Sequence, residues 1–113
     1  MGNPIVRFEI GCDDAGKTKA FYETLFAWKI EPAGPGLAID TGAAPSGGIA
    51  SLGHEPRHYT MFYVQVDDAA GALAKVKELG GKTLVGPVPL PTGTFAWFAD
   101  PEGNTVGLWQ PRL

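Results

Sequence analysis

The sequence is poor in the residues that build disulfides and metal sites. Its 113 residues include one cysteine, Cys12, and two histidines, His54 and His58. A single cysteine cannot form a disulfide within the chain. Because Cys12 lies between the apolar residue Ile10 and the start of a helix, we expect a buried, unreactive thiol. The low cysteine count fits a reducing compartment, and we therefore predict a cytoplasmic protein.

The sequence also has few charges and no long apolar run. Charged residues make up 19% of the chain, the formal net charge is −3, and Lys and Arg do not cluster. It therefore lacks the basic footprint of a nucleic-acid-binding protein. Residues 1–9 predict neither a signal peptide nor a membrane span. With 44% hydrophobic residues, residues 1–113 suit one small folded domain. The charge pattern and the lack of a long apolar run predict no nucleic-acid or membrane partner.

A repeat divides this domain. Residues 8–14 (FEIGCDD) reappear as residues 62–68 (FYVQVDD), 54 residues later. We place module 1 at about residues 1–53 and module 2 at about residues 58–113. A strand–helix unit of this size cannot bury its apolar face alone, so the two copies must pack together. The groove between them is the expected binding site.

The first module reads as β-α-β-β-β. Alternation in residues 5–11 predicts a strand with Arg7 and Glu9 on one face. Asp13 or Asp14 is expected to cap the following helix. Helical spacing predicts a buried stripe on this helix, made of Thr18, Phe21, Tyr22, Leu25 and Phe26. The later strands are expected at residues 27–31, 37–40 and 47–52, and a linker at residues 53–57.

The second module repeats this order. A strand at residues 58–66 leads into a helix capped by Asp67 or Asp68. The predicted buried face of this helix consists of Ala69, Ala72, Leu73, Val76 and Leu79. The following strand is expected at residues 82–85. Residues 86–91 contain three prolines and are expected at a sheet edge or in a loop. The last two strands are predicted at residues 94–99 and 104–109.

The tandem order predicts an α+β fold in which two βαβββ modules form cupped mixed sheets. The run at residues 20–28 (AFYETLFAW) and the ending at residues 98–109 (FADPEGNTVGLW) resemble the vicinal oxygen chelate superfamily. This superfamily includes glyoxalase I, bleomycin-resistance proteins and extradiol dioxygenases. The resemblance covers essentially the whole chain and is strongest to small bacterial glyoxalase-related proteins of poorly defined activity. The resemblance implies the fold and a pocket but leaves the reaction open. Because family members of this length usually pair, it also implies a twofold homodimer.

The resemblance also locates the family's metal ligands. In metal-dependent members, His, Glu or Gln side chains from both modules hold a divalent ion in the shared groove. The matching positions here are Arg7, Met61, Gly107 and, within about one residue, Ile49. Arginine keeps its proton, methionine sulfur binds hard ions weakly, and glycine and isoleucine have no side-chain donor. We therefore expect no metal, no other cofactor and a metal-independent function.

Alternation along the strands assigns the walls of the predicted pocket. Module 1 contributes Arg7 and Glu9, and module 2 contributes Met61, Tyr63, Gln65, Trp97, Gly107 and Trp109. In the strand before the last, either Phe95 and Trp97 or Phe98 faces the pocket, and we favour Trp97. The alternative is that these aromatic residues only fill the core of the two cupped sheets. The planar guanidinium of Arg7 suits a carboxylate or phosphate, and the aromatic rings suit a flat or apolar group. The predicted ligand is a small organic molecule that is anionic or aromatic.

Three functions remain open. The first is a non-catalytic protein that binds a small molecule, like the bleomycin-resistance branch. The second is an enzyme, either a lyase or isomerase related to lactoylglutathione lyase or a dioxygenase-like protein. In the metal-free lyase or isomerase, Glu9 would act as base and Arg7 as electrostatic clamp. The third is a dimeric interaction domain with a vestigial pocket. A purely structural Arg7–Glu9 ion pair is the alternative to both assigned roles.

Overall fold

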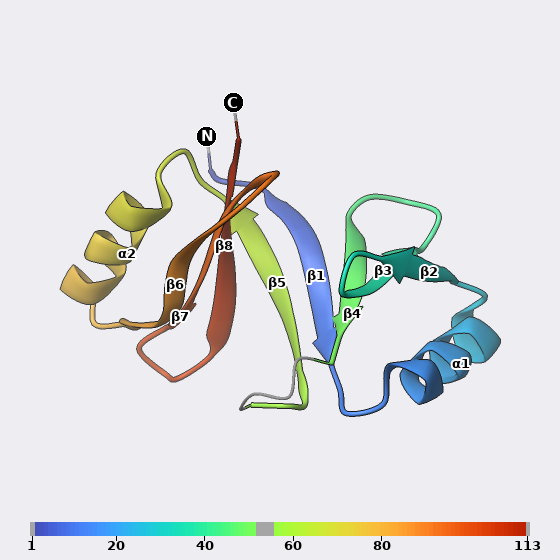
Figure 1. The fold of residues 1–113 in the computed structure, drawn as a ribbon. Coiled ribbons are helices and arrows are strands. Elements are labelled where there is room, and N and C mark those ends of the chain that lie inside the picture. Colours follow the sequence, from blue (N-terminus) through green and yellow to red (C-terminus); the bar gives the residue numbers. More distant parts are fainter. Residues whose placement is uncertain (1, 52–55, 113) are drawn as a thin grey trace. The chain divides into compact units, whose positions relative to one another are not determined.

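The computed structural model describes residues 2–51 and 56–112, which form two helices and eight strands (Figure 1). The first half contains β1 (Ile5–Gly11), α1 (Ala15–Phe26), β2 (Lys29–Ala33), β3 (Gly36–Asp40) and β4 (Ser46–Ala50). The second half contains β5 (Tyr59–Gln65), α2 (Ala69–Glu78), β6 (Lys82–Leu90), β7 (Gly93–Ala99) and β8 (Thr105–Pro111). The predicted βαβββ order is therefore confirmed twice. Neither helix is long and apolar enough to cross a membrane.

The chain forms two compact units. The first unit is Val6–Met61, and the second unit consists of residues 62–112 together with residues 2–5. Hydrogen bonds explain why the N-terminal residues belong to the second unit. Gln65 donates its backbone N–H to the Pro4 carbonyl at 2.9 Å, and the Asn3 side-chain amide donates to the Gln65 carbonyl at 3.0 Å. Part of the predicted linker, including His54, lies outside the described residues.

The first unit contains a mixed sheet with the strand order β2-β3-β4-β1. β1 runs parallel to β4, with Glu9 opposite Gly48, while β3 is antiparallel to both β2 and β4. Its buried core consists of Cys12, Ile30, Ile39 and Ile49. The predicted burial of Cys12 is confirmed, since only 8% of the surface of this residue is exposed to solvent.

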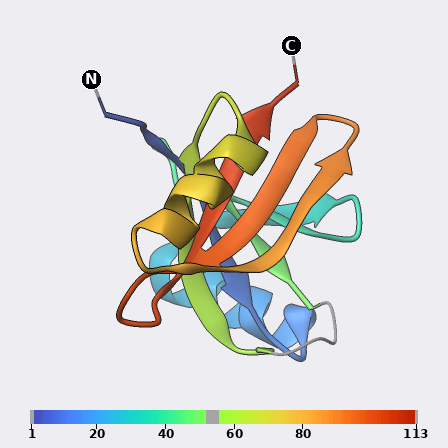
Figure 2. The same cartoon turned by 90° about the vertical axis from the view of Figure 1, so that its left-hand side faces the viewer.

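The second unit has a mixed sheet with the strand order β5-β8-β7-β6. β5 and β8 are parallel, and β6, β7 and β8 are antiparallel neighbours. α2 lies across one face of this sheet (Figure 2) and packs against β6, β7 and β8. Leu73 from α2 joins Ala96 and Leu108 from the sheet in the buried core of this unit.

The proline-containing strand lies at the edge of the sheet, as predicted. β6 is longer than the predicted strand at residues 82–85 and continues to Leu90. Its pairing with β7 shifts register on both sides of Val85. An edge strand tolerates prolines because the missing N–H groups need not pair with a strand on the outer side. The register shifts let the strand continue past Pro87, which the sequence pattern did not predict.

The helix caps agree with the sequence, and one buried stripe does not. Asp14 accepts from the Lys17 N–H at 3.0 Å, and Asp68 accepts from the Gly71 N–H at 3.1 Å, so these residues cap α1 and α2. The predicted burial of the α1 stripe was wrong: Phe21, Leu25 and Phe26 are 59%, 56% and 53% exposed, and Thr18 and Tyr22 are only partly buried.

The exposure of α1 follows from what it packs against. This helix contacts β2 and β4, and β4 carries a glycine, Gly47, beside the ring of Phe8. A strand with so little side-chain surface cannot cover a wide apolar stripe. Tyr22 and Ala15 reach the core cluster. On α2, Ala69 and Leu73 are buried as predicted, whereas Leu79, which caps the helix, is 77% exposed.

The turn between β7 and β8 is organised by one carboxylate. Asp100 Oδ1 accepts from the backbone N–H groups of Glu102 at 3.0 Å and of Asn104 at 2.9 Å. Its Oδ2 accepts from the Asn104 side-chain amide at 2.9 Å. These hydrogen bonds, led by the one from the Asn104 side chain, lower the pKa of Asp100 because they favour the charged carboxylate.

We expect the Asp100 carboxylate to stabilise the fold in a pH-dependent way. Because its pKa is lowered in the folded state, its contribution is present above the pKa of the unfolded chain and is lost as the pH falls through the folded pKa. Asp100→Asn should therefore be less stable than the wild type at neutral pH, and this difference should shrink in strong acid. Urea unfolding at neutral and acidic pH measures it, with Asp67→Asn as the control. A stability difference that does not change with pH would contradict the expectation.

Candidate polar site on the first strand

The polar face of β1 carries Arg7 and Glu9 together, as alternation predicts. Glu9 is a buried acidic residue, with 8% of its surface exposed. Its Oε1 atom lies 3.7 Å from Arg7 Nη2, and its Oε2 atom accepts a hydrogen bond from the Tyr59 hydroxyl. The Arg7 side chain is 45% exposed. The site therefore presents a partly exposed cation that is backed by a buried carboxylate.

Two glycines make room for these side chains. Gly48 lies opposite Glu9 in the pairing of β1 with β4, and a Cβ atom at Gly48 would lie 2.5 Å from Arg7 Nη2. A Cβ atom at Gly11 would collide with the ring of Tyr59. Any larger residue at either position would displace the group that contacts Glu9. The arrangement of the site thus depends on missing side chains as much as on those present.

Sequence analysis missed Tyr59. This residue begins β5 and supplies the hydroxyl that Glu9 accepts. Alternation could have found it, because Tyr59 is two residues before Met61 and so faces the same side of the strand. The repeat does not indicate a role for Tyr59, because the equivalent residue 54 positions earlier is the apolar Ile5.

In the second unit, the structure brings three other predicted site residues together. Trp97 Nε1 donates to the Tyr63 hydroxyl at 2.8 Å, and both side chains are buried. Gly107 is the register partner of Tyr63 on one side and of Trp97 on the other. The ring of Tyr63 occupies the space where a Gly107 side chain would be. Tyr63 and Trp97 thus pair their polar groups with each other inside the second unit.

The remaining predicted site residues are Gln65, Trp109 and Met61. Gln65 and Trp109 are register partners in the pairing of β5 with β8, and both are partly buried. Met61 is buried within the first unit. The structure therefore groups Arg7 with Glu9, and separately Gln65 with Trp109.

The residues at the four family metal positions do not fit a metal ion. Ile49 and Met61 are buried, the Tyr63 ring covers Gly107, and the Arg7 guanidinium cannot act as a donor ligand. Within residues 2–51 and 56–112, no three His, Cys, Asp or Glu side chains gather closely enough to hold a metal ion. No step of chemistry is therefore assigned to a metal at these positions.

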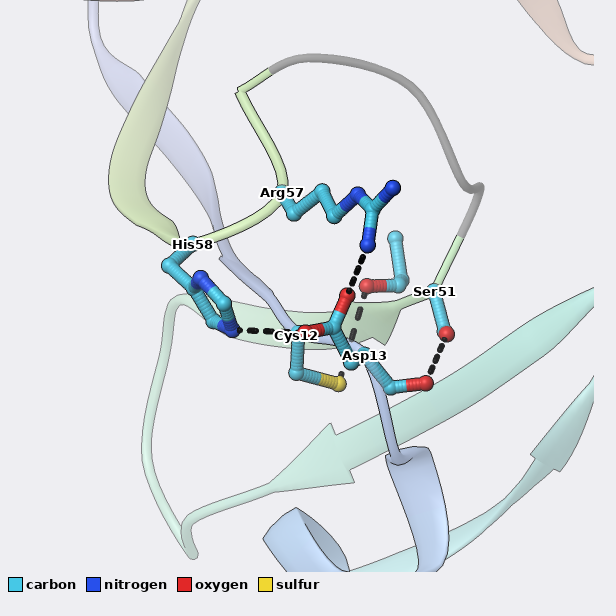
Figure 3. Close-up of polar contacts among 6 residues, drawn as sticks. Cys12, Asp13, Ser51, Arg57 and His58 are labelled. Carbon is cyan, nitrogen blue, oxygen red and sulfur yellow. Dashed lines mark hydrogen bonds and ion pairs between the residues drawn. The ribbon is translucent and has the colours of Figure 1, made fainter.

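His58 lies instead in an exposed cluster around Asp13 (Figure 3). Its Nε2 atom is 3.2 Å from Asp13 Oδ2, and Arg57 Nη1 is 3.6 Å from Asp13 Oδ1. Ser51 Oγ donates to the Asp13 carbonyl at 2.7 Å. These contacts connect the start of β5 to the residue before the α1 cap, and both Asp13 and His58 are largely exposed. Ion pairs of this kind contribute little to stability.

Comparisons with known proteins agree on the fold. The family model described as "Glyoxalase/Bleomycin resistance protein/Dioxygenase superfamily" matches residues 4–108. A "Glyoxylase-like domain-containing protein" of Didymella fabae is 32% identical over 115 residues, with 88% of each chain covered. A superfamily member from Vibrio splendidus superposes with a TM-score of 0.66 at 14% identity, covering 98% of this chain and 100% of that one. Methylmalonyl-CoA epimerase from Mycobacterium tuberculosis gives 0.64 at 11% identity, with 96% and 88% covered.

The buried Tyr63–Trp97 hydrogen bond predicts a stability effect. Tyr63→Phe removes the acceptor of a buried indole N–H, which should cost about 1–3 kcal/mol in the free energy of unfolding. Urea unfolding measures the change. Tyr22→Phe is the matched control, because Tyr22 stacks on Trp28 at 5.3 Å and its hydroxyl has no hydrogen-bond partner among the described residues. Equal losses in the two variants would show that the Trp97 contact contributes nothing specific.

Proposed function

This chain belongs to the glyoxalase/bleomycin resistance protein/dioxygenase superfamily, and from this premise we propose that it binds a small organic anion at Arg7 without a metal ion. The observation that carries the proposal is the exposure of the Arg7 side chain, which is 45% exposed while its Nη2 atom lies 3.7 Å from Glu9 Oε1. The superfamily covers several activities, so the ligand class is argued from this side chain and not from the fold.

The chemistry of arginine favours a carboxylate or phosphate ligand. A guanidinium has five N–H donors in a planar fork and binds a carboxylate through two parallel hydrogen bonds. At 3.7 Å, the contact with Glu9 Oε1 is an ion pair that is too long for a hydrogen bond. Glu9 can therefore orient the guanidinium, and an incoming anion can use donors on its exposed part. Gly48 leaves room for the guanidinium itself, since a Cβ atom at this position would lie 2.5 Å from Arg7 Nη2.

The surroundings of Glu9 favour binding over turnover. A general base needs an oxygen within hydrogen-bond reach of the proton that it removes. Here Oε2 accepts from the Tyr59 hydroxyl, Oε1 faces Arg7, and the residue is buried. Glu9 thus supports our proposal as the group that positions Arg7. The lyase or isomerase with Glu9 as base is the second candidate, and it would require Tyr59 to release this carboxylate.

Metal independence is part of the proposal, since Arg7, Ile49, Met61 and Gly107 do not supply a divalent-ion site. The ligand contacts predicted for Tyr63, Gln65, Trp97, Gly107 and Trp109 of the second unit, and for Met61 of the first, stay predictions.

We expect Arg7→Ala to weaken the binding of small carboxylates. Malonate and phenylacetate serve as probes in calorimetric titrations, and phenylacetamide is the neutral analogue. Removal of a charge-assisted hydrogen bond should cost about 1–3 kcal/mol in binding free energy for the acids. The neutral analogue should be unaffected by the substitution. Unchanged affinity of the acids for Arg7→Ala would place the anion elsewhere.

Arg112→Ala is the matched control, because Arg112 is another exposed arginine and lies at the end of the second unit. Thermal unfolding of each variant shows whether a loss of binding reflects a loss of folding. Repeating the wild-type titration in the presence of a chelator tests metal independence. Binding that disappears with the chelator and returns with a divalent ion would contradict this part of the proposal.

A homodimer remains our proposal for the assembly. Leu25 and Phe26 of α1 are more than half exposed, and covering such apolar surface is favourable. We propose that a second copy of this chain covers them. Sedimentation at micromolar concentration should give twice the mass of 11.9 kDa, and Leu25→Glu should shift the protein towards the monomer. A wild-type protein that sediments only as a monomer would refute the dimer.

A further inference from the structure

We propose that the first unit carries a second binding site, which takes a small aromatic anion, in a groove between α1 and the start of β5. The groove has a volume of about 590 Å³, and small-molecule sites commonly span about 300–1,000 Å³. Its walls include Lys17, Phe21 and Tyr22 of α1, His58 just before β5, and Tyr59 at the start of β5. Arg7 and Glu9 do not line it, so this site is separate from the one at Arg7.

Aromatic rings form one wall of the groove. Phe21 is 59% exposed and meets the ring of Tyr22 edge-on, with the centroids 5.1 Å apart. Tyr22 is held in turn by stacking on Trp28 at 5.3 Å. The wall is therefore a fixed ring beside a solvent-exposed one, and a flat ligand can stack there and cover apolar surface that is now in contact with water.

The charge of the groove selects an anion. Lys17 is the permanently charged cation among the lining residues, while the His58 imidazole contacts the Asp13 carboxylate, and no acidic residue is among the described lining residues. Lys17 makes no ion pair within the described part of the chain, whereas Lys19 pairs with Glu23 at 3.0 Å. The Lys17 backbone N–H is already bound by Asp14. The ammonium group, and not the helix end, is therefore the anion contact.

Polar groups that line the groove add further contacts. Thr18 and Thr60 also line it and provide hydroxyl groups. The His58 ring is oriented by its 3.2 Å contact with Asp13 (Figure 3). Tyr59 faces both sites, since its ring lines the groove while its hydroxyl donates to Glu9. Cation, hydroxyls and stacked rings together match a flat ring that bears one carboxylate.

NMR titration of the 15N-labelled wild-type protein tests the site, with 2-naphthoate as the probe and 2-naphthamide as its neutral analogue. We expect amide shifts at Gly11, Lys17, Thr18 and Thr60. Lys17→Gln should weaken 2-naphthoate binding roughly five- to tenfold, as for the loss of one charge-assisted contact. The same substitution should leave 2-naphthamide binding unchanged.

Matched variants distinguish binding at this site from nonspecific electrostatic attraction of the anionic probe and from binding at Arg7. Lys19→Gln removes a neighbouring charge of the same helix and should not change binding. Phe21→Ala should weaken both probes, while Leu79→Ala, which alters an exposed apolar residue of the second unit, should weaken neither. The site is refuted if Lys17→Gln and Lys19→Gln have equal effects. The site is also refuted if millimolar 2-naphthoate shifts the amide signals only of residues around Arg7, or shifts none. The effect of Arg7→Ala on binding at Arg7 can be measured whichever result is obtained here.

Discussion

The candidate site depends on close approach between large side chains and glycines of adjacent strands. The Arg7 guanidinium lies beside Gly48, and the Tyr59 ring lies over Gly11. In a sheet, neighbouring strands are about 4.8 Å apart, so a side chain can lie flat across the next strand only where that strand has no Cβ atom. The hydrogen bond from Tyr59 to Glu9 and the orientation of Arg7 both follow from this constraint.

The two halves repeat the fold and differ in chemistry. Glu9 and Tyr63 are related by the 54-residue offset, and each is the buried polar residue at the centre of its strand. Glu9 accepts from the Tyr59 hydroxyl, whereas Tyr63 accepts from the Trp97 indole. A buried polar group must be hydrogen-bonded in either case. The first unit satisfies this requirement with a charged cluster that includes Arg7, and the second unit with neutral aromatic groups, which is why we propose anion binding in the first unit.

Several features were readable in the sequence because they depend on local chemistry. Asp14 and Asp68 cap their helices since a short side chain can reach the free N–H groups of the first turn. Alternation placed Arg7 and Glu9 on one face. The burial of α1 was not readable, because helical spacing shows which residues share a face and not whether a neighbouring strand has enough surface to cover it. Phe21 is exposed for that reason.

The sequence by itself determined the βαβββ order and the poor metal-ligand chemistry of Arg7, Met61 and Gly107. It also narrowed each helix cap to one of two Asp residues and the proline-containing segment to a sheet edge or a loop. Each of these follows from residue type and short-range spacing. Only the tertiary structure decided that Tyr59, 50 residues from Glu9 in the chain, holds its carboxylate, and that Trp97 holds Tyr63. These partners come from strand register, which is set by packing over the whole sheet and not by local pattern.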